Sequence, residues 1–319
     1  MKLAIIGWGH VARHLGRILA ERQGDCRFEI SGILRRSGAV CGSVNPVAPE
    51  FGPPMQAHEF LDECHADILV ELSTLAPESG EPAIGHIQSA LARDMHVVTA
   101  NKGPIAHAWR DLACEASRRG VRLLHESAVM DGAPVFNLFR HNLPGVKLLG
   151  FTGILNSTTT VVLEAMERGE SFDSGVRRAR ALGIAEEDHA NDTDGWDAAA
   201  KTAALANVLM DAGVTPAAIE REGIGAFTPE RMREINADRK TVRLVSRAET
   251  TGDGLRLSVR PELLERSDPL AAVSGTSNLI LFHTDRMGTI GTVSVSPGVE
   301  QTAYGVYVDL MDLVRYPAL

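Results

Sequence analysis

Residues 3–12 read LAIIGWGHVA and join an apolar run to a short glycine-containing turn. Such a continuous apolar run is typical of a strand that is buried on both faces of a sheet. Gly7, Gly9 and Ala12 follow the spacing G-x-G-x-x-A, and residues 11–22 carry apolar side chains at helical spacing. Gly7 permits a tight turn, Gly9 lets the backbone approach a pyrophosphate, and Ala12 keeps helix and strand close. The stretch therefore predicts a dinucleotide site, and the alternative is a glycine-rich turn without a ligand.

Strand and helix patterns alternate over the first 126 residues. Further strands are predicted at residues 28–34, 67–72, 96–100 and 121–126, with helices between most of them, notably near 81–93 and 105–119. This alternation is typical of a parallel sheet that carries helices on its faces. The first part of the chain is therefore predicted to be a Rossmann-type α/β domain.

The pattern changes after about residue 132. A strand is predicted at 145–155, helices near 157–168, 172–182 and 195–212, strands at 241–248, 255–260, 278–284 and 289–296, and a last helix at 299–315. Alternating polar and apolar residues in the later strands indicate sheet faces that differ in burial. We expect an α+β second domain with an open sheet.

Composition argues against several classes of protein. The 319 residues suffice for two domains, and the formal net charge of −9 argues against a general nucleic-acid surface. No apolar stretch approaches the roughly 18 residues that cross a bilayer. The four cysteines form no CxxC pair, which favours a reduced, cytoplasmic chain without structural zinc. We therefore expect a small-molecule partner, and neither nucleic acid nor a membrane.

Two pairs of residues follow predicted strands at positions where a nucleotide cofactor binds. Arg35 and Arg36 come after the second strand, where an arginine favours NADP and an acid favours NAD. NADP is therefore expected and NAD remains possible; the alternative is that both arginines are solvated loop charges. Asn101 and Lys102 come after the strand at 96–100, at the sheet edge that binds ligands. Lys102 is a candidate contact to cofactor or substrate, or else a surface lysine.

Four strings resemble the homoserine dehydrogenases in order and spacing: TANKGPIA at 99–106, GILNSTTTVVLEAM at 153–166, LGIAEEDHANDTDGWDAAAK at 182–201 and PGVEQTAYGVYVDL at 297–310. The resemblance implies a cofactor domain of residues 1–132 with 297–319, and a substrate-binding and dimerisation domain of residues 133–296. It also implies hydride transfer between NAD(P)H and L-aspartate 4-semialdehyde, which gives L-homoserine, in a homodimer.

The acid-rich string at 182–201 carries the implied substrate site. Asp197 and Lys201 are four residues apart and share one helix face. By resemblance Lys201 transfers the proton, Lys102 lies between nicotinamide and substrate, and Glu186, Asp192 and Asp197 bind the substrate. A desolvated lysine can serve as acid and base, and carboxylates suit a substrate ammonium group. The alternative is a solvated acidic patch at a helix N-terminus.

The resemblance implies further ligand positions. The cofactor set is Gly7, Gly9, His10, Val11, Arg35, Arg36, Ser73, Thr74, Asn101, Lys102 and Gly298. His10 has a plainer interpretation as the first residue of the helix. The string HESAVMDGAP at 125–134 resembles a site for a monovalent cation such as Na⁺ or K⁺, held largely by backbone carbonyls at Glu126, Val129, Asp131 and Ala133. The alternative there is a plain strand-to-helix turn.

Several residues depart from the family pattern. Ser157 replaces a usual glycine, and Val299 and Glu300 stand where alanine and glycine are common. Two other hypotheses therefore stay open: a dehydrogenase for a different amino or hydroxy acid, and a cofactor-binding regulator without activity. Lys102 and Lys201 argue against the regulator, because such a protein needs no proton transfer.

Overall fold

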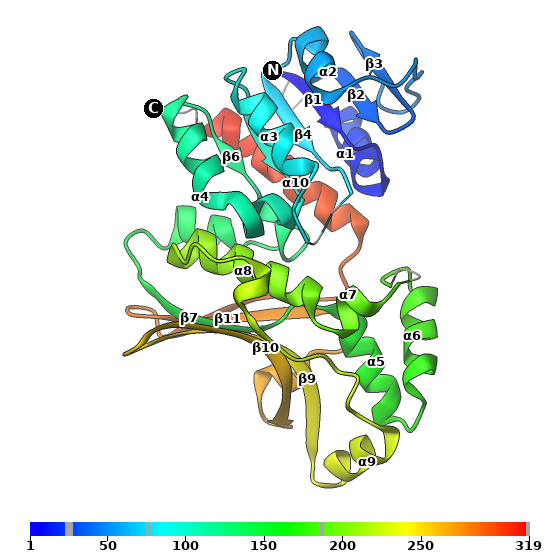
Figure 1. The fold of residues 1–319 in the computed structure, drawn as a ribbon, viewed down its shortest axis with the longest axis vertical. Coiled ribbons are helices and arrows are strands. Elements are labelled where there is room, and N and C mark those ends of the chain that lie inside the picture. Colours follow the sequence, from blue (N-terminus) through cyan, green and yellow to red (C-terminus); the bar gives the residue numbers. More distant parts are fainter. Residues whose placement is uncertain (23–27, 75, 77, 186–187, 317–319) are drawn as a thin grey trace. The chain divides into compact units, whose positions relative to one another are not determined.

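The computed structural model describes residues 1–316 except 23–27, 75, 77 and 186–187. The chain forms two compact units, Met1–Asn137 with Gly298–Leu319, and Leu138–Pro297 (Figure 1). Each unit contains a six-stranded sheet. The α/β class predicted from the sequence is confirmed, and each unit is described below by itself.

The sheet of the first unit has the order β3-β2-β1-β4-β5-β6. Its strands are β1 Lys2–Ile6, β2 Glu29–Arg35, β3 Gly38–Cys41, β4 Ile68–Glu71, β5 His96–Thr99 and β6 Leu123–Leu124. All neighbours pair in parallel except β3, which forms an antiparallel hairpin with β2. The sequence did not predict β3. The expected strand at 121–126 is also shorter, because Glu126–Ala128 turns into the 3₁₀ helix η1.

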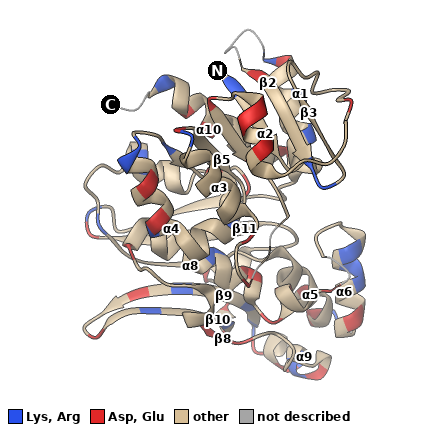
Figure 2. Ribbon diagram, turned by 45° about the horizontal axis from the view of Figure 1, so that its top comes forward, with Lys and Arg blue, Asp and Glu red and all other residues tan. Residues whose placement is uncertain are grey.

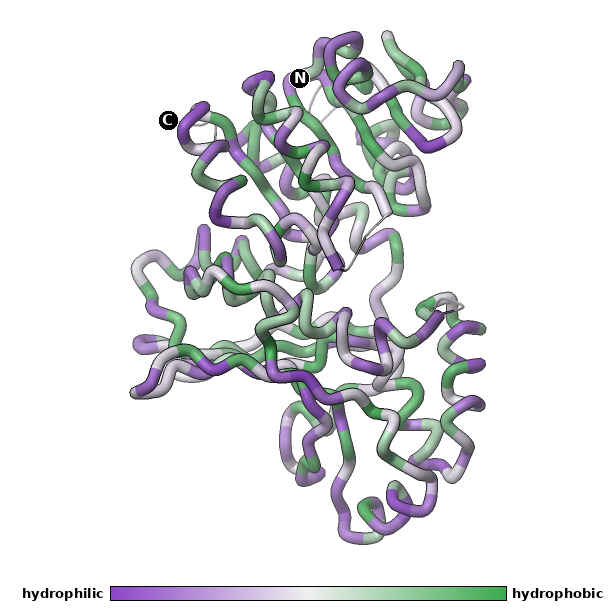
Figure 3. The backbone as a smooth tube through the Cα atoms, in the orientation of Figure 1, coloured by the Kyte–Doolittle hydropathy of each residue, from purple (hydrophilic) through white to green (hydrophobic). Residues whose placement is uncertain are grey.

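Helices cover both faces of this sheet. They are α1 His10–Glu21, α2 Ala57–Cys64, α3 Ala83–Leu91, α4 Lys102–Arg118 and α10 Val299–Arg315. Leu3 and Ile5 pack with α1 and α10, whereas Ala4 and Ile6 pack with α2, α3 and α4. Successive side chains of a strand point to opposite faces, so β1 is buried on both sides. Figure 3 shows the resulting hydrophobic colour along these strands.

The C-terminal helix α10 completes the first unit. It packs beside α1, and Val306 and Leu310 are fully buried in the same apolar cluster as Leu15 of α1. Arg122 after α4 forms an ion pair of 2.6 Å with Asp312 of α10. The chain therefore leaves this unit after Asn137 and returns to it at Gly298.

The sheet of the second unit has the order β12-β11-β7-β9-β10-β8. Its strands are β7 Leu148–Ile154, β8 Glu220–Arg221, β9 Lys240–Thr251, β10 Gly254–Glu265, β11 Asn278–Thr284 and β12 Thr289–Ser294. Neighbours are antiparallel except β8 and β10. β7, β9, β11 and β12 were predicted within three residues of these bounds, whereas the strand predicted at 255–260 covers only the first half of β10. The two-residue strand β8 was missed.

Among the described residues, five α-helices accompany this second sheet: α5 Ser157–Glu167, α6 Phe172–Ala181, α7 Ala190–Thr193, α8 Trp196–Met210 and α9 Pro229–Ala237. The alanine-rich helix α8 packs against β9 and β10, and α5 lies beside α6. Alanine side chains let α8 approach the sheet closely, and six of them are buried. Figure 2 shows the basic, outward face of α6, whereas α8 carries few charges. No helix in the described ranges is long and apolar enough to cross a membrane.

Candidate active site

Helix α8 carries the lysine and one of the acids predicted to bind substrate. It begins after Gly195, whose φ of 82° is readily adopted by glycine. Asp197 lies in the first turn and Lys201 one turn later, and their Oδ2 and Nζ atoms are 3.0 Å apart. The ammonium group also donates a 2.7 Å hydrogen bond to the carbonyl of Leu155. The two side chains are only 16% and 18% exposed, so solvent screens this ion pair less than a surface pair.

Asn156 joins the two acids. Its side-chain Nδ2 donates to Asp192 Oδ1 at 2.7 Å and to Asp197 Oδ2 at 2.9 Å. Its Oδ1 accepts the backbone N–H of Thr159, so Asn156 is also the N-cap of α5. The sequence interpretation assigned Asn156 no role. An asparagine directly before Ser-Thr-Thr-Thr was a recognisable helix start, but nothing in the sequence showed which distant acids it would meet.

Burial and the second acid both act on Asp192. Desolvation raises the pKa of the Asp192 carboxyl, and the nearby charge of Asp197 raises it further. Hydrogen bonds from Asn156 and Thr158 and the charge of Lys201 act in the opposite direction. The pKa of the Asp192 carboxyl remains above its ordinary value, with burial as the largest cause. A cation placed beside Asp192 would favour the ionised form of this carboxyl.

The rest of the acid-rich string divides into described and undescribed parts. Glu186 lies outside the described residues. Asp188 is exposed and its carboxylate accepts the N–H of Ala190 at the start of α7. The structure thus brings together Asp192, Asp197 and Lys201 within the second unit, whereas Lys102 belongs to the first.

The glycine turn has the geometry that a dinucleotide requires. Gly7 has a φ of 96°, and a Cβ there would lie 2.2 Å from the carbonyl oxygen of Leu72. Gly9 is the N-cap of α1, and a Cβ there would meet nothing within 4 Å. Exposed His10 begins α1, and Gly9, as the N-cap residue, has no side chain with which to cap that helix. The first backbone N–H groups of α1 are therefore suited to a phosphate.

A cavity of about 170 Å³ lies at the carboxyl ends of the first unit's strands. Its lining consists of Val11, Leu72, Ser73, Ala100, Asn101, Lys102 and Thr302. Ser73 Oγ is buried and makes no hydrogen bond to the described residues. An unpartnered buried hydroxyl is costly, which is consistent with a ligand that supplies the partner. Of the other predicted cofactor contacts, Thr74 and Gly298 are exposed, and Gly298 is the N-cap of α10.

Buried Glu71 organises one wall of this cavity. At the end of β4, its carboxylate accepts the N–H of Ser73 at 3.0 Å and the hydroxyl of Thr99 at 3.2 Å. The same Thr99 hydroxyl accepts the N–H of Asn101. The side-chain oxygen of Asn101 in turn accepts the N–H of Gly103 and so caps the first turn of α4. Lys102 is the first residue of that helix. The sequence interpretation did not single out Glu71 or Thr99, because both occur inside strings typical of buried strands.

The two arginines after β2 have different surroundings. Arg36 is exposed in the two-residue turn of the β2–β3 hairpin. The Arg35 guanidinium lies over the Phe51 ring, 3.8 Å from the ring centroid, in a cation–π contact. Arg35 Nε is buried and makes no hydrogen bond to the described residues. Arg35 ends β2 and Arg36 follows it, so both arginines are at the carboxyl end of this strand, the end at which dinucleotides bind in this fold.

The predicted cation segment uses its side chains for internal contacts. The Glu126 carboxylate accepts backbone N–H groups of Val135, Phe136 and Asn137. Asp131 has a φ of 58°, and its carboxylate accepts the hydroxyl of Thr302 at 3.1 Å. No group of three or more His, Cys, Asp or Glu side chains in the described part of the chain could hold a metal ion. An ion bound here would therefore depend on backbone carbonyls.

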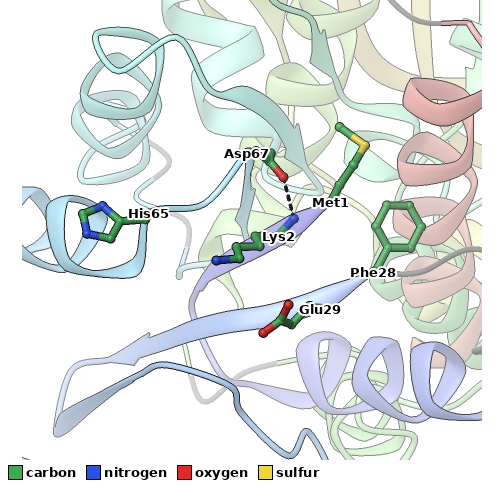
Figure 4. A pocket seen from close by; sticks show the side chains of 6 residues that line it. All are labelled: Met1, Lys2, Phe28, Glu29, His65 and Asp67. Atoms are coloured by element: carbon green, nitrogen blue, oxygen red, sulfur yellow. Dashed lines mark hydrogen bonds between the residues drawn. The ribbon is translucent and has the colours of Figure 1, made fainter.

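A separate cavity of about 680 Å³ lies at the opposite end of the strands (Figure 4). It is lined by Met1, Lys2, Phe28, Glu29, His65 and Asp67. The Asp67 carboxylate accepts the backbone N–H of Lys2 at 2.7 Å. Nucleotides bind at the carboxyl ends of parallel strands, so this cavity at the amino ends is not the cofactor site.

Comparisons with known proteins agree with this arrangement. A family model described as homoserine dehydrogenase matches residues 134–311, and a model of the homoserine dehydrogenase NAD binding domain matches residues 7–126. The chain belongs to the homoserine dehydrogenase family. The NAD(+)-dependent homoserine dehydrogenase of Pseudomonas canavaninivorans is 32% identical over 98% of this chain and 96% of its own length. The homoserine dehydrogenase of Methanocaldococcus jannaschii is 32% identical, with 98% of both chains covered.

Solved homoserine dehydrogenases share the fold. A putative homoserine dehydrogenase from Archaeoglobus fulgidus gives a TM-score of 0.89 at 28% identity, over 98% of this chain and 99% of that one. A hyperthermophilic archaeal homoserine dehydrogenase in complex with NADPH gives a TM-score of 0.85 at 28% identity, over 100% of this chain and 99% of that one. Because coverage is nearly complete in both directions, the likeness extends over the whole length of this chain.

Proposed function

We propose that this chain catalyses the reversible, NAD(P)-dependent interconversion of L-homoserine and L-aspartate 4-semialdehyde. The observation that carries the proposal is the half-buried cluster of Asp192, Asp197 and Lys201, fixed around the buried Asn156. A solvated acidic patch would need neither the asparagine bridge nor the contact between Lys201 and Leu155 O. Family membership over the full length and the glycine turn at Gly7 support the same reaction.

The proton transfer is assigned to Lys201. A bound nicotinamide supplies the hydride acceptor or donor. Oxidation of an alcohol also releases the hydroxyl proton, and reduction of the aldehyde needs a proton in return. Lys201 is held by Asp197 and by the carbonyl of Leu155, which fix the direction of its ammonium group. Lys102, at the start of α4 beside the cofactor cavity, is the second lysine proposed to act near the reacting atoms.

The acids are assigned to the substrate's α-ammonium group. Asp192 and Asp197 are adjacent through Asn156, and the raised pKa of Asp192 indicates that a further cation is favourable there. Glu186, outside the described residues, is proposed as another partner of the same group. An ammonium group taken out of water requires such carboxylate partners, because an uncompensated buried charge is costly.

NADP is the proposed cofactor, although the relatives differ. The Pseudomonas relative is named as NAD(+)-dependent, whereas the archaeal structure is a complex with NADPH. Arg35 and Arg36 after β2 support NADP in this chain, because a guanidinium binds a 2′-phosphate with paired hydrogen bonds. The remaining contacts are assigned to Gly7, Gly9 and Val11 at the turn and to Ser73 and Asn101 in the cavity.

Three further properties belong to the proposal. A Na⁺ or K⁺ ion binds backbone carbonyls at Glu126, Val129, Asp131 and Ala133. The chain forms a homodimer through its second unit, where Val293 of the edge strand β12 and Val295 just after that strand are 59% and 74% exposed. The enzyme acts in the cytoplasm, where its free cysteines remain reduced.

The direct test is a spectrophotometric assay of purified protein. L-homoserine should reduce NADP⁺, and should reduce NAD⁺ with a lower kcat/KM. The Lys201→Ala variant is the matched control, with turnover lower by about 10² or more. L-serine and 4-hydroxybutyrate test the hypothesis of a different substrate. Equal or greater kcat/KM with either compound, or no turnover with L-homoserine, would contradict the proposed reaction.

A further inference from the structure

Two consecutive residues at the β7–α5 junction hold the whole charged cluster. The carbonyl of Leu155 accepts from Lys201 Nζ at 2.7 Å. The amide of Asn156, 3% exposed, donates to Asp192 at 2.7 Å and to Asp197 at 2.9 Å. The position of one backbone turn therefore sets the place of the proton-transfer group and of both acids.

The orientation of the Asn156 amide is determined by its neighbours. Its Oδ1 accepts the N–H of Thr159 at 2.8 Å, which leaves the NH₂ end toward the carboxylates. An amide NH₂ has two hydrogens, and carboxylates are acceptors only, so each acid can receive one. The hydroxyls of Thr159 and Thr160 donate to the backbone carbonyl of Asn156 at 3.0 and 3.2 Å and hold the junction itself.

We propose that Asn156 is a positioning residue, whose amide fixes the separation of Asp192 and Asp197 so that both face the substrate ammonium beside Lys201. The inference rests on the proposed function and adds to it a determinant of substrate binding. Two neighbouring carboxylates repel each other, and a shared donor offsets that repulsion with two charge-assisted hydrogen bonds. A helix cap alone would use only the Oδ1 atom.

The charges around Asp192 are consistent with this role. Asp197 and Lys201 face it from α8, and Asn156 and Thr158 from α5. The Asn156 hydrogen bond lowers the pKa of the Asp192 carboxyl against the larger effects of burial and of Asp197. Removing this donor therefore makes Asp192 harder to ionise, and an ionised Asp192 is the form that attracts the ammonium group.

The test uses two variants that keep the helix cap and change the bridge. Serine and aspartate are both good N-cap residues, so Asn156→Ser and Asn156→Asp retain an acceptor for Thr159 N–H. Asn156→Ser loses the bridging donor, and Asn156→Asp replaces it with a third carboxylate group. We expect kcat/KM for L-homoserine to fall about 10- to 150-fold for each charge-assisted bond lost. The Kd of NADP⁺ should change little.

The pH profile separates positioning from a structural role. In Asn156→Ser the acid limb of kcat/KM should move to higher pH, because the pKa of Asp192 rises. Asn236→Asp on the exposed face of α9 is the matched control, with an unchanged profile. The melting temperature of each variant verifies that it folds. If Asn156→Asp unfolds, the result with Asn156→Ser alone decides the test. If the wild type is active and Asn156→Ser keeps a near-normal kcat/KM and pH profile, the inference is overturned. If the wild type itself is inactive towards L-homoserine, the proposed function is contradicted instead.

Discussion

Glu126 offers a quantitative test of the segment that was predicted to bind a cation. Its side chain is 1% exposed, and its two oxygens accept three consecutive backbone N–H groups, those of Val135, Phe136 and Asn137. We expect Glu126→Gln to destabilise the first unit, because this carboxylate caps the turn that leads out of it.

The magnitude follows from the geometry. Glutamine keeps one carbonyl oxygen, which can serve the N–H groups of Val135 and Phe136 as a neutral acceptor. In the wild type the backbone nitrogen of Asn137 lies 2.6 Å from Glu126 Oε2. In the variant an NH₂ group replaces that oxygen, so two hydrogen-bond donors face each other. Hydrogen bonds to a charged group contribute about 1.5–3 kcal/mol, so the free energy of unfolding should fall by about 2–4 kcal/mol. For a unit of this size the melting temperature should fall by roughly 5–15 °C.

Scanning calorimetry with and without added NADP⁺ measures this shift and identifies the unit that binds the cofactor. Glu234→Gln is the control, since Glu234 is 66% exposed in a surface ion pair with Arg231. Its effect should stay within about 0.5 kcal/mol. The shift in Glu126→Gln should be the same with Na⁺, K⁺ or neither, because the carboxylate caps backbone groups. A shift no larger than the control, or one that depends on the cation, would refute this reasoning.

Three other variants test the proposed site. Lys201→Ala should lower turnover by about 10² or more with unchanged NADP⁺ affinity in a fluorescence titration, and near-normal turnover would remove Lys201 from proton transfer. Glu186→Gln should raise the KM for L-homoserine in initial-rate assays, since it weakens a partner of the ammonium group; unchanged KM and kcat would indicate a solvated acid. Replacing Arg35 and Arg36 together by alanine should weaken NADPH binding roughly 10- to 150-fold and leave NADH nearly unaffected, and equal losses for both cofactors would refute phosphate recognition.

Apolar periodicity predicted most of the fold because most elements are long or strongly patterned. β11 and α10 begin and end where the alternating and helical patterns do. β3, β8 and α7 were missed, since two to four residues carry too little periodicity. α9 was also missed, because its sequence PERMREINA buries only Met232 and Ile235.

The cysteines show what spacing cannot reveal. They appear scattered in the sequence, yet the Sγ atoms of Cys41 and Cys64 lie 3.3 Å apart. Cys41 is opposite Gly32 in the β2–β3 hairpin, and a Cβ on Gly32 would lie 2.1 Å from Cys64 Sγ. Because Gly32 has no side chain, the sulfur of Cys64 fits beside the strand and reaches Cys41. This contact depends on how α2 packs on the sheet, which the spacing of the cysteines does not reveal.

The candidate site was predictable where its residues share one element. Asp197 and Lys201 are one helical turn apart, so their contact follows from the spacing alone. Asn156 is 36 residues before Asp192 in the chain, and only the packing of α5 against α7 brings them together. Glu71 is similar, because its contact to Thr99, 28 residues later, arises from the parallel pairing of β4 and β5.

The electrostatics of the acid cluster bear on the choice between an amino-acid substrate and a simple hydroxy acid. Asp192 already experiences burial and the charge of Asp197, and its pKa stays raised despite Lys201 and Asn156. An α-ammonium group favours the ionised form of Asp192, so its binding should strengthen as pH rises through that pKa. A hydroxy acid lacks this cation and would desolvate the two acids without compensating them, which disfavours binding. Sites built to pair with a polar group reject analogues that lack it, so we expect this cluster to favour L-homoserine over a hydroxy acid of the same length.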